Sequence, residues 1–242
     1  MIKYKTRIRI ALFRIAPFVV VWRLFNSFHY KKESFSIKSK LPFTLIYEEN
    51  RWNYEESVSG GGSTLLATTT LRSFLPKFFL EYDIHSILDI PCGDYNWMNL
   101  VEKKDIAYIG ADIVEPLVEL NNKKYSADNV SFKVIDLTKD SLPQVDLIFC
   151  KDCLQHLSHE KVFSALKNIK NSGSKYLLTT SYPLTLRNWD ILDGDYRPLN
   201  ILKKPFLLSN PLLKIQELSK EGGNELDKTM YLWEIKSLPD FI

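Results

Sequence analysis

Three acidic residues in the middle of the chain each lie at or just after the end of a short apolar run. Asp89 lies in SILDI, Asp112 in AYIGADI, and Asp136 directly follows VSFKVI. If these runs are parallel strands, their carboxyl ends meet at one edge of a sheet, where ligands bind. Asp112 follows Asp89 by 23 residues, close to the ~20 residues expected of a ribose-binding carboxylate. The set predicts a nucleoside pocket, in which Asp136 bonds the amino group of an adenine. The alternative is that each acid only caps a helix or a turn.

The turn after the first acid limits the kind of nucleoside. ILDIPCGDYNWM contains one glycine, Gly93, where the dinucleotide fingerprint needs three. Pro91 and Tyr95 stand where a bound pyrophosphate would need close approach of the backbone. A ligand with a nucleoside but no phosphates fits this turn better, and S-adenosylmethionine is such a ligand.

A second group of reactive side chains lies in CKDCLQH, residues 150–156. Asp152 and His156 are four residues apart, so a helical turn would place them on one side. Histidine is the natural base near neutral pH, and Asp152 would orient it or bind an acceptor. The alternative is that His156 packs locally and caps the next helix. Cys150 and Cys153 do not predict a zinc site, because no second Cys or His pair follows at a suitable spacing.

These residues require an alternation of strands and helices to bring them together. Short apolar runs and helical patterns alternate from His85 onward, and two strand-like runs close the chain around SKEGGNELDK. This order predicts an α/β, Rossmann-like, doubly wound sheet, mostly parallel, with a C-terminal antiparallel hairpin. The expected strands are 86–90, 107–113, 130–135, 145–150, 176–180, 212–218 and 229–236, and the clearest helices are 115–124 and 158–171.

A long stretch between Tyr182 and Pro211 has no clean periodicity and carries polar groups beside an aromatic residue. Long irregular loops in compact domains are more often functional than decorative. Asn188 and its polar neighbours suit a hydroxyl-rich acceptor such as a sugar, and Arg197 could clamp a phosphate or carboxylate. The alternative is a solvated loop of turn-forming residues.

Basic charge is concentrated at the N-terminus. Residues 1–40 hold ten Lys and Arg against Glu33 alone, a formal charge of +9 in a chain of net +3. The rest of the chain is therefore acidic, which does not indicate a nucleic-acid partner. Residues 1–40 are expected to form a basic, apolar extension, either packed on the domain or in peripheral contact with a membrane. Pro17 is expected to weaken any single long helix there.

Composition and cysteine count limit the class of protein and the compartment in which it is expected. With 242 residues, 45% hydrophobic and 25% charged, the chain is not a disordered, collagen-like or coiled-coil protein. Three cysteines suit a reducing compartment, so a cytoplasmic protein, possibly at a membrane through its extension, is expected. The predicted division is 1–40 as extension and 41–242 as catalytic domain, with its core in 83–236.

The same motifs resemble those of class I S-adenosylmethionine-dependent methyltransferases over about residues 47–236. ILDIPCGDYNWM resembles their motif I, GADIV the acidic motif after the second strand, VIDL the adenine motif, and DLIFCKDCLQHLS motif IV. YEENRWNYEESVSGGGSTLLATTTLRSFLP and GDYRPLN further resemble a bacterial subgroup associated with polysaccharide and small-molecule modification.

This resemblance implies a role for each matching residue. Asp89 would serve the methionine amino group and Gly93 would let the backbone approach the cofactor. Asp112 would hold the ribose, with Ile113 beside the adenine and Asp136 on its amino group. Residues 150–156 would face the sulfonium.

A glycine-rich segment precedes the sheet. Residues 59–63 (SGGGS), ending at Ser63, stand at the apparent N-cap of a helix, where free backbone N–H groups suit the cofactor's carboxylate. The alternative for this segment is a flexible linker.

These residues fit three functions to different degrees. The leading expectation is methyl transfer from S-adenosylmethionine to a hydroxyl of a small molecule or glycan, with no metal. One alternative is a non-catalytic nucleoside-binding protein docked by its basic N-terminus. A nicotinamide-dependent oxidoreductase is less well supported, because it requires the missing glycines.

Overall fold

The computed structural model describes residues 2–30, 42–217 and 226–241, and for residues 2–15 it describes the backbone only. In these parts of the chain seven strands form one sheet in the order β3-β2-β1-β4-β5-β7-β6. The first five pair in parallel, whereas β7 runs antiparallel to both β5 and β6. The strands are β1 (Ser86–Asp89), β2 (Ala107–Asp112), β3 (Val130–Val134), β4 (Leu147–Cys150), β5 (Tyr176–Ser181), β6 (Leu213–Gln216) and β7 (Thr229–Glu234). The predicted fold class is confirmed.

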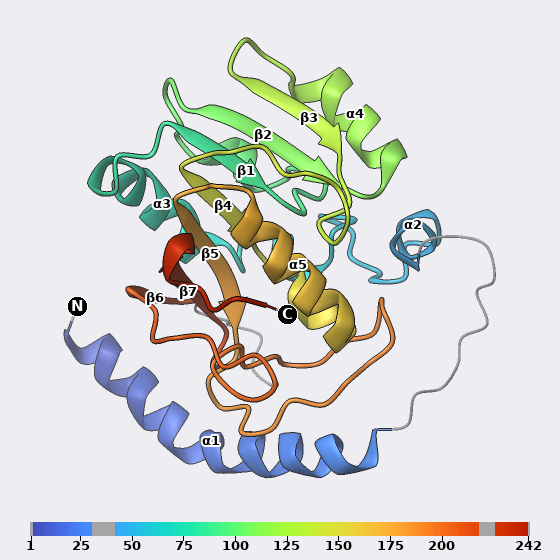
Figure 1. Cartoon of the computed structure of the whole chain (residues 1–242). Helices are drawn as coiled ribbons and strands as arrows, with labels where there is room; N and C mark the ends of the chain where they lie inside the picture. Colours follow the sequence, from blue (N-terminus) through green and yellow to red (C-terminus); the bar gives the residue numbers. More distant parts are fainter. Residues whose placement is uncertain (1, 31–41, 218–225, 242) are drawn as a thin grey trace.

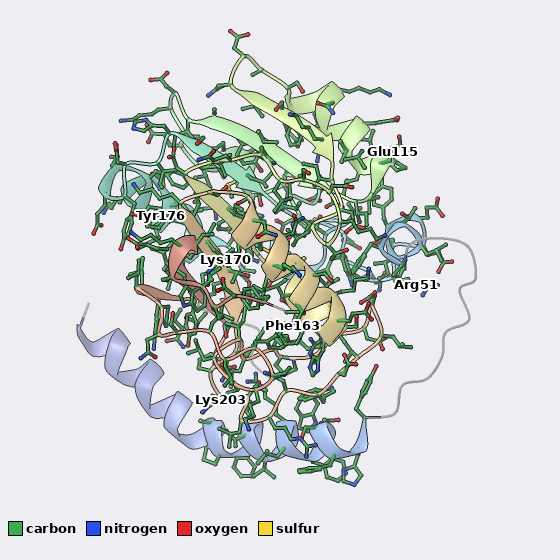
Figure 2. The ribbon with its side chains drawn as sticks, viewed as in Figure 1. Arg51, Glu115, Phe163, Lys170, Tyr176 and Lys203 are labelled. Atoms are coloured by element: carbon green, nitrogen blue, oxygen red, sulfur yellow. The ribbon has the colours of Figure 1, made fainter. Side chains whose placement is uncertain are left out.

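Helices cover both faces of this sheet, and side chains fill the space between the layers (Figures 1 and 2). Neighbouring residues of β1 point to opposite faces, so Leu88 packs in the core that includes α5 and Ile87 in the core that includes α3. The helices are α1 (Ile2–His29), α2 (Pro42–Glu48), α3 (Thr69–Glu81), α4 (Glu115–Tyr125) and α5 (His159–Asn171).

Helix α5 shows how local sequence signals set its ends. The Ser158 side chain accepts a hydrogen bond from the Lys161 N–H and caps the N-terminus. Val162, Leu166 and Ile169 form its buried face, at the spacing of one side of a helix. Gly173 follows the C-terminus with φ 70°, a conformation that glycine adopts without strain.

The expected strand ends differ from the observed ones by a few residues. The strand expected at 145–150 begins at Leu147, and the one expected at 212–218 ends at Gln216. Most of the loop SKEGGNELDK, together with residues 31–40 of the expected extension, lies outside the described residues.

Helix α1 differs from the expectation at Pro17, because it continues through this proline as one helix. A proline removes a single hydrogen bond of the helix. In Figure 1, α1 runs along one side of the molecule, next to the loops that follow β5 and away from α4. The Arg23 guanidinium there forms an ion pair of 2.7 Å with Asp227, which holds the C-terminal half of α1 to the body. In the described residues no helix is long and apolar enough to cross a membrane.

Candidate functional site

A cavity opens where β1, β2 and β4 end, beside the point at which the strand order reverses. Its empty space is ≈ 1070 Å³ including its open mouth. The walls contain every site residue expected from the strand ends, the SGGGS segment and the 150–156 segment: Ser63, Asp89, Gly93, Asp112, Ile113, Asp136, Asp152 and His156. The topology therefore brings these groups together from separate parts of the chain.

Asp112 shapes the turn after β1 as well as the cavity. Its carboxylate accepts hydrogen bonds from the Gly93 N–H at 3.1 Å and the Val114 N–H at 3.0 Å. Gly93 has φ 56°, and a Cβ added there would lie 2.2 Å from the Ser59 hydroxyl oxygen. The turn therefore requires glycine at this position, both for its backbone conformation and for the contact with residue 59.

Two carboxylates of the cavity are buried enough to resist ionisation. Asp89 is 3% exposed and accepts a hydrogen bond of 2.5 Å from the Tyr108 hydroxyl. Burial raises the pKa of Asp89 to about 7. The hydrogen bond from Tyr108 and the positive charges of Lys103 and Lys151 lower this pKa, but burial has the larger effect. Burial also raises the pKa of Asp112 to about 6, although backbone N–H groups oppose the shift. A cation bound between them would restore both charges.

The cost of the buried Asp89 charge can be measured in the free protein. In the unfolded chain this carboxyl ionises near 3.8 and in the folded chain near 7, so stability is lost as pH rises between these values. At pH 8, Asp89→Asn should raise the free energy of unfolding by on the order of 1–3 kcal/mol. The gain should disappear near pH 4. Denaturant unfolding at both pH values checks this, with the exposed Asp128→Asn as control; a variant less stable at pH 8 would contradict it.

Asp136 lies in the cavity wall but also organises its own turn. Its Oδ1 accepts from the Thr138 N–H at 2.9 Å and the Thr138 hydroxyl at 2.6 Å, and Lys139 lies 3.2 Å from Oδ2. Burial alone would raise its pKa, but these bonds outweigh burial and lower it. Asp136 therefore stabilises a turn, as the alternative interpretation expected, and also lines the cavity in which the adenine contact was predicted.

Tyr95 does not line the cavity, although it belongs to the turn after β1 where a pyrophosphate would approach. It has φ 57° and is 4% exposed. Its ring lies in an aromatic cluster with Tyr108, Tyr125 and Phe132, each at a centroid distance of 5.1 Å. Pro91, in contrast, does line the cavity.

The SGGGS segment is not the N-cap of a helix, which corrects the sequence expectation. Residues Gly61–Ser63 form one short 3-10 turn, and α3 begins only at Thr69. The segment packs on the turn after β1: the Ser59 hydroxyl oxygen accepts from the Asp94 N–H at 2.9 Å. The Gly62 carbonyl accepts from Lys151 at 2.8 Å.

His156 stands partly buried in the cavity wall between two aromatic rings, Trp52 at 5.8 Å and Tyr196 at 5.6 Å between centroids. Its Nδ1 lies 2.9 Å from the Asp195 backbone carbonyl oxygen. Because a carbonyl only accepts hydrogen bonds, Nδ1 carries the hydrogen, and in the neutral ring Nε2 is the proton acceptor. Burial lowers the pKa of His156 below 6.5, so the neutral ring predominates at pH 7.

Asp152 is bonded differently from the sequence expectation. The expected helical turn is a 3-10 turn, Leu154–His156, and Asp152 precedes it with φ 53°. The carboxylate of Asp152 bonds Lys151, and Lys228 at 2.5 Å, while the ring of His156 is oriented by Asp195. Burial alone would raise the pKa of Asp152, but the charges of Lys151 and Lys228 hold it well below its usual range. Asp152 is therefore an anion at neutral pH.

Two cysteines lie on either side of Asp152 in the sequence. Cys150 is buried on β4, and Cys153 lines the cavity. The pKa of Cys153 is raised well above 9.0 by its hydrogen bond with Cys150 and by burial. Among the residues that the structure describes, no group of His, Cys, Asp and Glu could hold a metal ion.

The two predicted acceptor contacts, Arg197 and Asn188, lie outside the cavity wall. Arg197 is fully buried and donates from Nη1 to the Leu157 carbonyl at 2.5 Å, whereas Nε and Nη2 have no hydrogen-bond partner among the described residues. The Asn188 amide bonds backbone groups at Asn200 and Lys204, each at 2.9 Å. The loop is therefore packed into the body rather than solvated.

Several cavity residues were not among the site residues predicted from the sequence. Phe43, Tyr47 and Trp52 come from the segment before the sheet and form an aromatic part of the wall. Lys151 also lines the cavity, beside Trp97, at 6.0 Å from its ring centroid. Trp52 lies in the stretch that resembles the methyltransferase subgroup, which was the only indication of a role.

The comparisons with known proteins agree with this geometry. Residues 87–172 match a family model described as a methyltransferase domain. No curated protein matches the sequence. Solved structures share the fold at low identity. The N-methyltransferase NodS from Bradyrhizobium japonicum, in complex with S-adenosyl-l-homocysteine, is 13% identical, with a TM-score of 0.58 over 78% of this chain and 97% of that one.

Two further structures have the same fold. Human N-acetylserotonin methyltransferase, in complex with S-adenosylmethionine, is 12% identical, with a TM-score of 0.55 over 90% of this chain and 66% of that one. An S-adenosylmethionine-dependent methyltransferase from Clostridium acetobutylicum is 16% identical, with a TM-score of 0.52 over 79% of this chain and 97% of that one.

Proposed function

We propose that this chain is a class I S-adenosylmethionine-dependent methyltransferase and that it methylates a hydroxyl group of a small molecule or glycan. The observation that carries the choice of a hydroxyl is His156. It is a neutral imidazole in the cavity wall whose Nδ1 is fixed on a backbone carbonyl, so Nε2 is left as the basic atom. A hydroxyl acceptor must lose a proton during transfer, and such a base supplies that function.

The donor set of the cavity fits the cofactor. Three carboxylates in the wall, Asp89, Asp112 and Asp136, disfavour a phosphate-bearing ligand and suit a nucleoside with a cationic tail. We assign the methionine amino group to Asp89, the ribose hydroxyls to Asp112 and the adenine to Ile113 and Asp136. When bound, the cofactor supplies a methyl group on a sulfonium, which is reactive without further activation by the protein.

The chain's own residues must then align the acceptor and take its proton. His156 removes the proton at Nε2, while the Asp195 carbonyl keeps the ring in the tautomer that can accept it. Asp152 is too weak a base for this step, because Lys151 and Lys228 stabilise its charge. We propose that Asp152 positions the acceptor side of the site by binding these two lysines.

The acceptor is proposed to lie against the aromatic wall, where Trp52 and His156 stand next to each other. Flat aromatic faces beside a few polar groups are typical of sites for small organic ligands. Arg197 is fully buried outside the cavity wall, so we assign it the role of holding its own loop to the Leu157 carbonyl rather than of contacting the acceptor. Asn188 would act indirectly, by fixing the loop that carries Arg197.

The test is transfer of a deuterated methyl group to two matched sets of acceptors. One set offers sugar and phenol hydroxyls, and the other offers the corresponding amines, with products read by mass spectrometry. We expect methylated hydroxyl products, formed roughly a hundredfold or more slowly by His156→Ala. Methylation of amines alone would contradict the hydroxyl assignment, and cofactor binding without transfer to either set would favour a non-catalytic binding protein.

A further inference from the structure

The C-terminal half of α1 presents two unlike faces. Val19, Arg23 and Ser27, spaced four residues apart, are buried against the body of the protein. On the opposite side, the large apolar residues are exposed by 75% at Phe18, 66% at Val21, 43% at Trp22, 58% at Phe25 and 67% at Phe28. We call these five residues the apolar face of α1. Figure 2 shows side chains of α1 projecting away from the rest of the molecule.

Charged and polar contacts fix this orientation. Arg23 bonds both carboxylate oxygens of Asp227, at 2.7 and 2.9 Å, and the Thr185 hydroxyl at 3.1 Å. Its guanidinium also lies 5.4 Å from the ring centroid of Tyr182. Rotating α1 to hide its apolar face would break a buried, bidentate ion pair and leave Asp227 without its partner. The helix is thus held with its most apolar side outward.

An exposed row of aromatic side chains indicates a binding surface, because each would gain free energy on leaving water. The charge of the same helix identifies the kind of surface. Besides Arg23, which is paired with Asp227, residues 1–32 contain seven Lys and Arg and no Asp or Glu, so the segment complements a negatively charged partner. The C-terminal half of α1 has Trp and Phe on one side and lies in this basic segment, a combination that suits the interface of an anionic bilayer. The helix is not a membrane span.

A second copy of the chain is a poorer occupant of this face. Pairing two α1 helices would bring together two segments that contain basic residues and no acid. Like charges at a contact disfavour association, whereas phosphate head groups would offset them.

We propose that α1 binds the surface of an anionic lipid bilayer, with the apolar face of α1 inserted among the lipid head groups and the Lys and Arg residues of segment 1–32 other than Arg23 attracted by their phosphates. This function is separate from methyl transfer and does not depend on the proposed acceptor. It would place the enzyme at a membrane without crossing it.

The experiment is co-sedimentation of the full chain with phosphatidylcholine vesicles, with and without phosphatidylglycerol. We expect binding to the anionic vesicles, and a loss of at least roughly tenfold in affinity when Phe25→Ser and Phe28→Ser are combined. The matched control is Leu120→Ser, which removes a leucine of 53% exposure on α4 and should bind like the unmodified chain. All three proteins should bind S-adenosylhomocysteine equally, which shows that they are folded.

Trp22 gives a direct readout of insertion. Brominated lipids in the anionic vesicles should quench part of the tryptophan fluorescence, and Trp22→Phe should remove that quenching. Equal vesicle binding by the double serine variant would overturn the proposal. So would a dimer in the absence of lipid that the double variant converts to a monomer, because a second copy would then cover this face.

Discussion

Replacing Asp112 by alanine is expected to weaken binding of S-adenosylhomocysteine by about a hundredfold or more. A carboxylate that accepts two ribose hydroxyls contributes about 3 kcal/mol through hydrogen bonds to a charged group, and about 2.7 kcal/mol corresponds to a hundredfold. The substitution also leaves the N–H groups of Gly93 and Val114 unpaired in the turn that approaches the ligand. Calorimetric titration at pH 8, well above the pKa of about 6 raised by burial, measures the effect with Asp112 ionised.

Two further variants separate ligand contact from damage to the turn. Glu115→Ala removes an exposed acid from the start of α4, three residues along the chain, and should bind the ligand normally (Figure 2). Asp112→Asn keeps one oxygen as acceptor and should lie between the two in affinity. If Asp112→Ala binds as tightly as the unmodified protein, the ribose assignment is wrong.

Replacing His156 by alanine is expected to slow turnover roughly a hundredfold or more while leaving the affinity for S-adenosylhomocysteine unchanged. The unmodified enzyme should lose activity as pH falls through the pKa of His156, which burial lowers below 6.5, because only the neutral ring accepts a proton. His156→Ala should lose this dependence on pH. Steady-state kinetics between pH 5 and 8 measure both effects.

The control is His85→Ala, which removes a histidine exposed by 77% at the start of β1. It should keep full activity and the same pH profile. A slow His156→Ala enzyme that retains the acid limb of the profile would show that another group removes the proton, and His156 would then only pack against Trp52.

Sequence periodicity was sufficient to predict the sheet, since near-continuous apolar runs such as LIFC become fully buried central strands. It also located the strand-end acids, because the carboxyl ends of parallel strands meet by topology alone. Asp89 and Asp112 needed no knowledge of side-chain packing to be placed in one cavity.

The acceptor side was harder to predict because it depends on contacts between distant parts of the chain. Lys228 follows Asp152 by 76 residues, and Trp52 meets His156 from the segment before the sheet. The four-residue spacing of Asp152 and His156 predicted an α-helical turn. The positive φ of Asp152 instead directs its carboxylate to the lysines.

The orientation of the N-terminal helix could not be predicted from the sequence for the same reason. Its charge and aromatic content were evident, but which side of α1 faces the body was decided by Arg23 and Asp227, which lie 204 residues apart.

The most direct test of the account is calorimetric titration of the whole chain with S-adenosylmethionine, S-adenosylhomocysteine and NAD under the same conditions. The turn after β1 has one glycine, Gly93, where the dinucleotide fingerprint needs three. We predict saturable binding of the first two ligands and none of NAD. Binding of NAD alone would contradict the assignment of the cavity.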